Sequence, residues 1–124
     1  MSNVVTGLAN CIDQGGVAIG AFSDNDIIGF ASIQNGLFGI NGDYLQLEML
    51  HVSYEYRNKG IGKSLFHIIC AEAKTFGARK LYISAHPSAE TQAFYKAIGC
   101  IEAVEINKKL FDEEPFDCHL EYCL

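Results

Sequence analysis

Apolar residues recur along this chain with two different spacings, and the change of spacing marks the predicted elements. Apolar stretches bounded by turn residues, with alternation clearest in the third, predict strands over residues 16–22, 27–34 and 44–52. The first two strands are close enough along the chain to form an antiparallel hairpin. From residue 61 the apolar positions follow the period of a helix, for which Gly77 is a favourable C-terminal stop.

The second half of the chain predicts more of the same sheet. A strand over residues 80–85 follows the helix, and the helical connection makes it parallel to the strand over residues 44–52. A second helix is predicted over residues 89–98, and an antiparallel pair over residues 100–106 and 118–122. The chain therefore predicts an α/β (α+β) fold with one mixed, mostly antiparallel twisted sheet and a central parallel pair.

Composition limits the class of protein. The 124 residues suit a single domain with one core over residues 1–124, and 49% apolar residues argue against disorder. Nine basic residues against fifteen acidic ones leave a net charge of −6, which argues against nucleic-acid binding. The basic side chains of Arg57, Lys59 and Lys63 cluster locally, which fits a small anionic ligand.

Neither a membrane anchor nor a metal site is expected. No apolar run is long enough to cross a membrane and no leader follows Met1, so we expect a cytoplasmic protein. The five cysteines are odd in number and form no C-x-x-C pair, which predicts free thiols. No cysteine and histidine spacing suits zinc, since the adjacent Cys118 and His119 point to opposite faces of a strand.

The candidate binding site is a glycine-rich turn between the third strand and the first helix. Such a turn gathers unpaired backbone N–H groups at the positive end of the helix, where phosphate binds. A Walker A loop would need glycine at Arg57, and a dinucleotide fingerprint would need glycine at Leu65. The pattern that remains is R-x-x-G-x-G, from Arg57 to Gly62.

This loop resembles the acyl-CoA loop of the GNAT family of N-acetyltransferases. A second segment, residues 93–100, is similar to that family's A-x-x-F-Y-x-x-x-G-F pattern in compressed form. The resemblance implies the GNAT fold, in which the two parallel strands splay apart, and acetyl-CoA as cosubstrate. The pantetheine arm would pair with backbone groups near Leu50, His51 and Val52. The pyrophosphate would lie on the amides of Arg57, Asn58, Lys59, Gly60, Ile61, Gly62, Lys63 and Ser64.

The resemblance also implies catalytic residues. Tyr95 is the candidate acid that protonates the departing thiolate, with a core aromatic beside Phe94 as the alternative role. Glu48 is the candidate base, with a solvated strand glutamate as the alternative. His51 is the other candidate base, but strand alternation places it opposite Glu48 unless a bulge intervenes. Ser88 stands where the family has an asparagine on the pantetheine arm, and it is also a candidate N-cap of the second helix.

The N-terminus departs from the family pattern of a strand and two helices before the first hairpin. Residues 1–15 suffice for about one short helix, over residues 4–13, so much of the acceptor wall is expected to be missing. A partner subunit could supply that wall, the site could be open, or the chain could be truncated. An exposed sheet surface of this kind favours a homodimer.

The leading functional hypothesis is transfer of an acetyl group from acetyl-CoA to a primary amine by direct attack in a ternary complex. The acceptor would be a small molecule or a peptide. The acidic balance weakly favours a cationic acceptor, such as a polyamine, an aminoglycoside or a lysine side chain. The alternative is a non-catalytic acyl-CoA-binding sensor or partner subunit, which the short N-terminus motivates.

Overall fold

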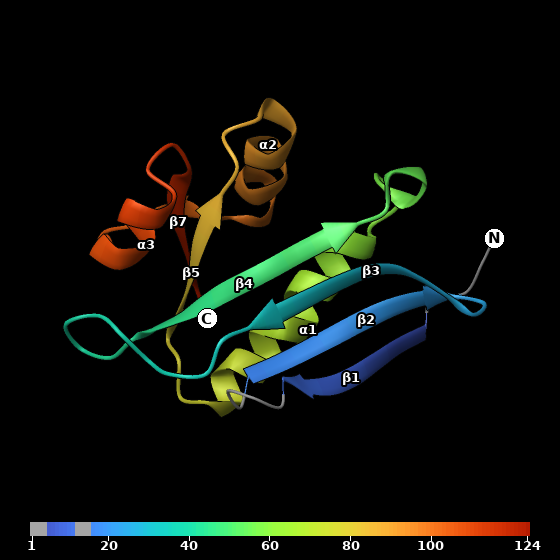
Figure 1. Ribbon diagram of the computed structural model, residues 1–124, viewed down its shortest axis with the longest axis horizontal. Helices are drawn as coiled ribbons and strands as arrows, with labels where there is room; N and C mark the ends of the chain where they lie inside the picture. Colours follow the sequence, from blue (N-terminus) through green and yellow to red (C-terminus); the bar gives the residue numbers. More distant parts are fainter. Residues whose placement is uncertain (1–4, 12–15) are drawn as a thin grey trace.

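The computed structural model describes residues 5–11 and 16–124, which form one mixed sheet with helices against it (Figure 1). Its strands lie in the order β1-β2-β3-β4-β5-β7-β6, and each neighbouring pair is antiparallel except β4 and β5. The mixed fold predicted from the sequence is confirmed. The elements are β1 (Val5–Cys11), β2 (Gly16–Ser23), β3 (Asp26–Ile33), β4 (Tyr44–Val52), the 3₁₀ turn η1 (Tyr54–Tyr56), α1 (Ile61–Thr75), β5 (Lys80–Ala85), α2 (Ala89–Ile98), β6 (Ile101–Glu102), α3 (Lys108–Glu113) and β7 (Cys118–Cys123).

The N-terminal segment corrects one expectation. The predicted short helix is wrong over residues 5–11, which form β1 and pair with β2 from Val5↔Phe22 to Cys11↔Gly16. The free edge of β2 offers a row of backbone partners, and pairing with this next strand in the sequence outweighs any helical preference of residues 5–11. The family's first strand is therefore present. In the part of the chain that the structure describes, no helix precedes β2, while residues 4, 12 and 13 lie outside that part.

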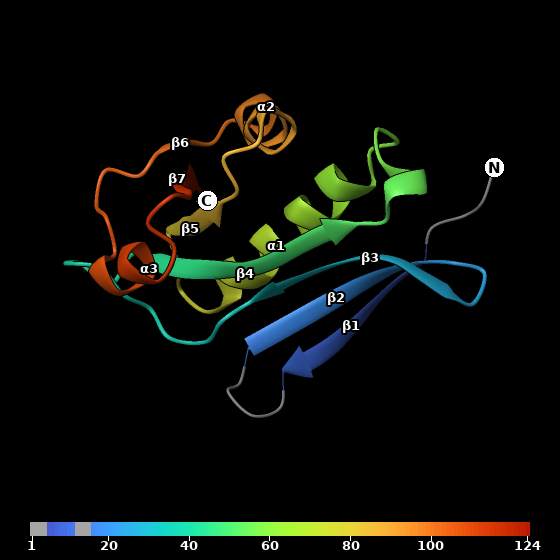
Figure 2. The same cartoon turned by 45° about the horizontal axis from the view of Figure 1, so that its top comes forward.

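Helix α1 covers one face of the sheet and closes the core (Figures 1 and 2). Its buried stripe includes Leu65, Phe66 and Ile69, which belong to one apolar cluster with Leu45 and Leu47 of β4. Helix α2 packs beside α1, since the rings of Phe66 and Tyr95 lie 6.3 Å apart. The opposite face of the sheet carries α3, which lies near β4, β5 and β7 (Figure 2).

The last part of the chain differs in detail from the prediction. The strand expected over residues 100–106 is only two residues long, and it pairs antiparallel with β7 as predicted. It ends early because the Val104 N–H donates to the Glu121 carboxylate at 2.9 Å instead of continuing the ladder. The following segment contains the short helix α3, one of the two forms expected.

A buried carboxylate ties the strands together at the start of the parallel pair. Glu121 of β7 is 1% exposed and accepts a hydrogen bond from the Tyr44 hydroxyl at 2.5 Å, with Lys80 Nζ at 3.3 Å. Burial alone would raise the pKa of Glu121, but the hydrogen bonds from Tyr44 and Val104 and the nearby Lys80 together hold that pKa below its usual value. One ionised group therefore links β4, β5 and β7.

No helix within the described ranges is both long and apolar enough to cross a membrane. Among those same residues, no three side chains of His, Cys, Asp or Glu gather as they would around a metal ion. The expectation of a metal-free protein stays a prediction.

Candidate active site

The parallel strands β4 and β5 separate partway along their length, and this separation creates the site. They are in register from Tyr44↔Lys80 to Leu47↔Ile83, and their pairing ends there although both strands continue (Figure 1). On its other side, β4 has a bulge. The register with β3 passes from Ser32↔Met49 to Ile33↔Leu47, so that Glu48 is the extra residue. A bulge bends a strand and increases its twist, which accounts for the divergence from β5.

The space that opens between the diverging strands β4 and β5 is called the wedge below. Two adjoining cavities occupy it. The first, of about 590 Å³, lies between the end of β4, the glycine-rich loop and the first turns of α2. The second, of about 330 Å³, lies between the separated parts of β4 and β5. They adjoin because four residues line both of them, namely Leu50, His51, Thr91 and Tyr95.

The glycine-rich loop presents a helix N-terminus to the first cavity. Asn58 and Gly60 have φ angles of 62° and 83°, in the left-handed region that brings the chain into α1. A Cβ on Gly60 would meet no atom within 4 Å, so the loop backbone is open on this side. No side chain caps α1, which leaves its first-turn N–H groups available to an anion.

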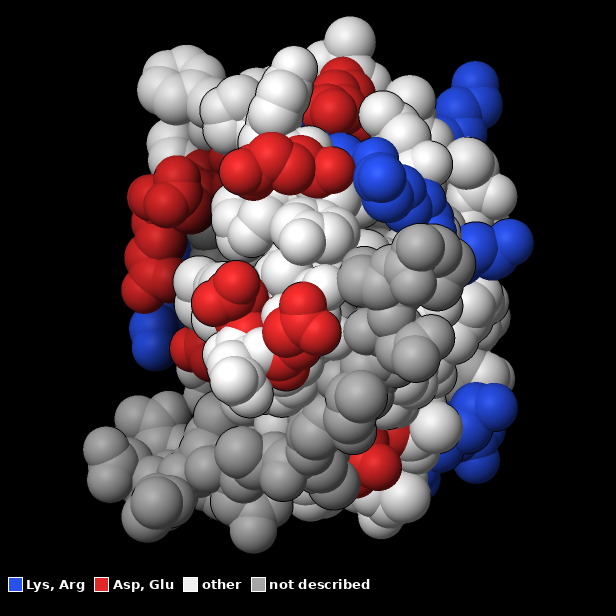
Figure 3. All heavy atoms as spheres, turned by 90° about the vertical axis from the view of Figure 1, so that its right-hand side faces the viewer, with Lys and Arg blue, Asp and Glu red and all other residues white. Residues whose placement is uncertain are grey.

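Arg57 anchors this loop rather than extending freely into solvent. Its Nε donates to the Val52 carbonyl at 3.0 Å, and its Nη1 lies 3.5 Å from Glu90 of α2. Figure 3 faces this end of the molecule and shows basic side chains along its right side, with acidic ones on the left and centre. The site available to an anion thus carries positive charge on an otherwise acidic surface.

The eight predicted loop residues separate into two groups. Five of them line the first cavity, namely Arg57, Asn58, Gly60, Gly62 and Lys63. Lys59 and Ser64 are exposed and Ile61 is buried in the core, and their side chains do not line it. The predicted Leu50, His51 and Val52 line it as well.

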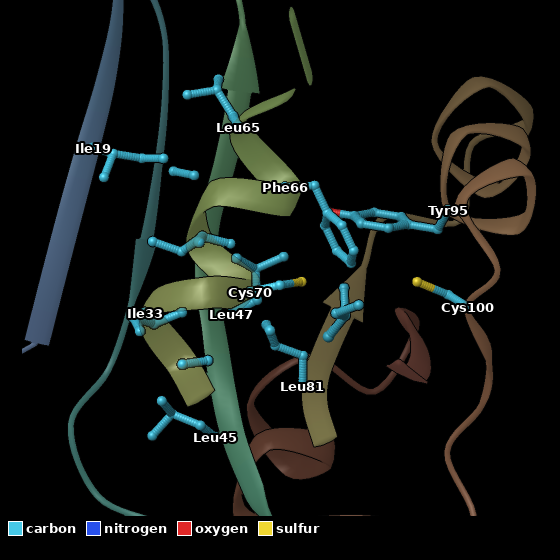
Figure 4. Packing of buried hydrophobic residues seen from close by; sticks show 14 of the residues in the cluster. Ile19, Ile33, Leu45, Leu47, Leu65, Phe66, Cys70, Leu81, Tyr95 and Cys100 are labelled. Carbon is cyan, nitrogen blue, oxygen red and sulfur yellow. The ribbon is translucent and has the colours of Figure 1, made fainter. Parts of the chain in front are cut away.

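Tyr95 lies where the two cavities meet. It projects from α2 toward Phe66 of α1 and is 7% exposed (Figure 4). Burial raises the pKa of its hydroxyl, and nearby Cys100 raises it further, so the hydroxyl stays protonated at neutral pH. The prediction of a packed aromatic and the prediction of a proton donor are therefore compatible.

Close helix packing sets the position of Tyr95. A Cβ on Gly62 would lie 3.0 Å from the Phe94 ring, so glycine at this position permits the close approach of α2 to α1. Phe94 and Tyr95 have ring centroids 5.1 Å apart and share this contact region. The second glycine of the R-x-x-G-x-G pattern thus serves packing, while the first serves the loop.

Glu48 is held in place by the neighbouring strand. Its carboxylate accepts a hydrogen bond from Ser32 Oγ at 3.2 Å and another from Gln34 Nε2. Regular alternation would place Glu48 and His51 on opposite faces, yet both line the second cavity, because the bulge lies at Glu48. The structure brings the two candidate bases together.

Thr91, and not the predicted Ser88, lines the cavities at the start of α2. Ser88 is the N-cap of α2, since its Oγ accepts from the Thr91 N–H at 3.3 Å and lies 2.9 Å from Thr91 Oγ1. Ser88 lines neither cavity, whereas Thr91 lines both. Sequence reasoning missed Thr91, and the available signal was its place in the first turn of a helix that begins at the site.

The described cysteine thiols lie outside the cavities. Burial raises the pKa of Cys70 and of Cys100 to about 12, so neither is a thiolate at neutral pH (Figure 4). Cys118 is half-buried and Cys123 exposed, and none of these four lines either cavity. They offer no thiol nucleophile to the wedge.

Comparison with known proteins agrees with this geometry. The sequence matches the family model described as "Acetyltransferase (GNAT) family" over residues 5–119. No curated protein sequence matches the chain.

Solved structures share the fold at low sequence identity. An IAA acetyltransferase from Bacillus cereus is 19% identical with a TM-score of 0.70, over 98% of this chain and 100% of that one. A GNAT family acetyltransferase from Elizabethkingia anophelis with acetyl-CoA bound is 18% identical, with a TM-score of 0.70 over the whole of both chains. The PaiA N-acetyltransferase from Thermoplasma acidophilum, in complex with coenzyme A, is 22% identical with a TM-score of 0.69 over 88% of this chain. The match spans 61% of the Thermoplasma chain. With the family model covering nearly all of the sequence, the chain belongs to the GNAT family of acetyltransferases.

Proposed function

We propose that this protein is an acetyl-CoA-dependent N-acetyltransferase that acts on a primary amine by direct attack in a ternary complex. The observation that carries the proposal is the wedge between β4 and β5, where the cavity at the glycine-rich loop meets the cavity at Glu48, with Tyr95 lining both. Two structures of similar fold are described as complexes, one with coenzyme A and one with acetyl-CoA, which supports acetyl-CoA as the donor.

Acetyl-CoA would lie along the first cavity. Its pyrophosphate would accept hydrogen bonds from the first-turn amides of α1, beside Arg57 and Lys63. Past Leu47, β4 keeps β3 on one side and has no described strand on the other, so its backbone groups are available to the pantetheine amides. Thr91 replaces Ser88 as our candidate for a side-chain contact to that arm.

Acyl transfer needs a base and an acid. Glu48 would take a proton from the ammonium group, directly or through water, with His51 as the alternative base in the same cavity. The freed amine would attack the thioester carbonyl, and the C–S bond would break as the tetrahedral intermediate collapses. The protonated Tyr95 would then give its proton to the departing thiolate, and the extra proton on the newly formed amide nitrogen would restore the Tyr95 hydroxyl, directly or through water.

The absence of a described helix between β1 and β2 favours a second candidate, a non-catalytic acyl-CoA-binding subunit. Isothermal titration with acetyl-CoA followed by a thiol-release assay over a panel of amines separates the two. We expect binding and turnover on at least one amine. Binding without turnover on any amine would support the sensor, and no binding would refute both.

We further propose that the protein is a cytoplasmic homodimer whose partner covers part of the exposed sheet face. The exposed Met49 and the aromatic pair of Phe30 and His51 support this, because they lie on β3 and β4 and no helix before β2 in the described chain is available to cover them. Light scattering after size exclusion should give twice the monomer mass of 13.6 kDa. A monomer at micromolar concentration would contradict it.

A further inference from the structure

One acidic side chain lines the first cavity beside two basic ones. The basic lining residues are Arg57 and Lys63, and the acidic one is Glu90 in the first turn of α2. Like charges repel, so a fixed carboxylate opposes the binding of a pyrophosphate in the same cavity. Glu90 therefore does not serve to attract the donor.

Glu90 is paired with Arg57 across the first cavity. Its Oε1 lies 3.5 Å from Arg57 Nη1, and among the described residues this is the one ion pair that joins the glycine-rich loop to α2. That separation is at the outer limit of a hydrogen bond, and the two side chains are 35% and 67% exposed. A pair of this kind adds little to stability, so a more highly charged anion can replace the carboxylate.

Arg57 has two further contacts that do not involve Glu90. Its Nε donates to the Val52 carbonyl at 3.0 Å, and its guanidinium lies over the Tyr54 ring at 5.6 Å from the ring centroid. Both partners precede Arg57 closely in the chain, and neither belongs to α2. Within the described ranges, the remaining guanidinium N–H groups have no hydrogen-bond partner. The guanidinium is therefore held at the cavity and can bind a phosphate when the carboxylate moves away.

We infer that Glu90 competes with the pyrophosphate of the donor for Arg57. In the free protein Glu90 neutralises Arg57, and on donor binding the pyrophosphate takes its place while the carboxylate turns into solvent. Release of CoA restores the ion pair, so Glu90 weakens donor binding and speeds the departure of the product. The inference rests on the proposed function and adds a residue that sets the affinity for its cosubstrate.

The variant Glu90→Gln tests the inference, because glutamine keeps the length of the side chain and removes its charge. Titration should show the dissociation constants of acetyl-CoA and of CoA falling by about threefold to tenfold. Stopped-flow displacement should show CoA leaving more slowly by a similar factor. Thermal unfolding without ligand checks that the variant is folded.

A second ligand and a second residue serve as controls. S-acetylpantetheine carries the thioester and the arm without any phosphate, so kcat/KM for this donor should be the same in wild type and Glu90→Gln. Glu55→Gln removes the same charge from an exposed position of η1 that lines neither cavity and has no ion pair among the described residues. It should change the affinity for acetyl-CoA by less than about twofold, because solvent and salt screen such a charge.

The outcomes separate the inference from the proposed function. Unchanged or weaker acetyl-CoA binding in Glu90→Gln would overturn the inference, and weaker binding would show that Glu90 orients Arg57. An equal gain in Glu55→Gln, or an equal gain with S-acetylpantetheine, would also overturn it, because the effect would not depend on exchange with the pyrophosphate. Absence of turnover on every amine, with tighter acetyl-CoA binding in Glu90→Gln, would refute the proposed catalysis and support the inference.

Discussion

The donor side and the acceptor side of the wedge are built in different ways. The donor side consists of β4, the glycine-rich loop, α1 and the start of α2, which are nearly consecutive in the chain and packed closely through Gly62. The proposed acceptor side is lined by side chains of β4, β5 and α2, with Ser32 of β3 bound to Glu48. The proposed donor site thus comes from nearly consecutive elements, whereas the proposed acceptor site combines elements that are farther apart in the sequence.

Tyr95 lies where the two sides meet, so its loss should have the largest effect. We expect Tyr95→Phe to lower kcat by about 10²- to 10⁴-fold, the usual contribution of a positioned acid. The affinity for acetyl-CoA, measured by titration, should change little, because the ring still packs against Phe66. An unchanged kcat would leave Tyr95 with a packing role alone.

A negative charge introduced on the donor side should strongly weaken the binding of acetyl-CoA. Gly60→Asp puts a carboxylate beside the anion site and a side chain at φ 83°, and should weaken acetyl-CoA binding about a hundredfold or more. Gly42→Asp is the matched control. Gly42 also has a positive φ, 66°, and open space around its Cβ, but it lines neither cavity. If Gly60→Asp keeps wild-type affinity in titration, the assignment of the loop to the pyrophosphate is wrong.

On the acceptor side, substitution of the base should change turnover and leave donor binding intact. We expect Glu48→Gln to lower kcat by roughly tenfold to a hundredfold with an unchanged dissociation constant for acetyl-CoA. His51→Ala measured alongside identifies the base, because both side chains line the second cavity. A larger loss in His51→Ala would transfer the role to His51.

The close packing of the donor side can be tested by a substitution that changes no charged or catalytic group. Gly62→Ala places a methyl group within 3.0 Å of the Phe94 ring, and overpacking of this kind costs about 1–3 kcal/mol. Denaturant unfolding should show the loss. Ser64→Ala, at an exposed position in the first turns of the same helix that lines neither cavity, controls for substitution by alanine. A stability equal to wild type would mean that α2 is free to shift.

The smallest expected effect concerns Glu121, the buried carboxylate that links β4, β5 and β7. The pKa of Glu121 is lowered in the folded protein, so its ionisation stabilises the fold above the usual glutamate pKa of 4.5. That contribution is lost as the pH falls below 4.5. Glu121→Gln should cost about 1–2 kcal/mol at pH 7 and flatten the acid limb of a stability curve against pH. An unchanged acid limb would assign that limb to other carboxylates.

Much of the donor side could be predicted from the sequence because its signals are local. The bounds of β4, β5 and α2 agree with the predicted ranges, since apolar spacing, an N-cap serine and a terminating glycine act within a few residues. The R-x-x-G-x-G pattern likewise located five residues of the first cavity. The roles assigned to Tyr95 and Glu48 stay predictions.

The features that escaped prediction depend on contacts between separate elements. Residues 5–11 form a strand because the adjoining β2 supplies a partner, and β6 is short because the Val104 N–H donates to the Glu121 carboxylate instead of to a backbone carbonyl. Thr91 reaches both cavities only because α2 packs against α1 at Gly62. None of these contacts leaves a periodic signal in the sequence.

The sequence by itself determined the order of the elements from β2 to α2, the family and the position of the glycine-rich loop, because backbone conformation at glycines, caps and apolar periods is a short-range property. The tertiary structure alone decided which side chains face the same cavity. The bulge at Glu48 set which side chains of β4 face the wedge, and the packing of α2 placed Thr91 and Tyr95 on both cavities. Strand register and facing are settled by partners far along the chain, and a shift of one residue reverses every side chain beyond it.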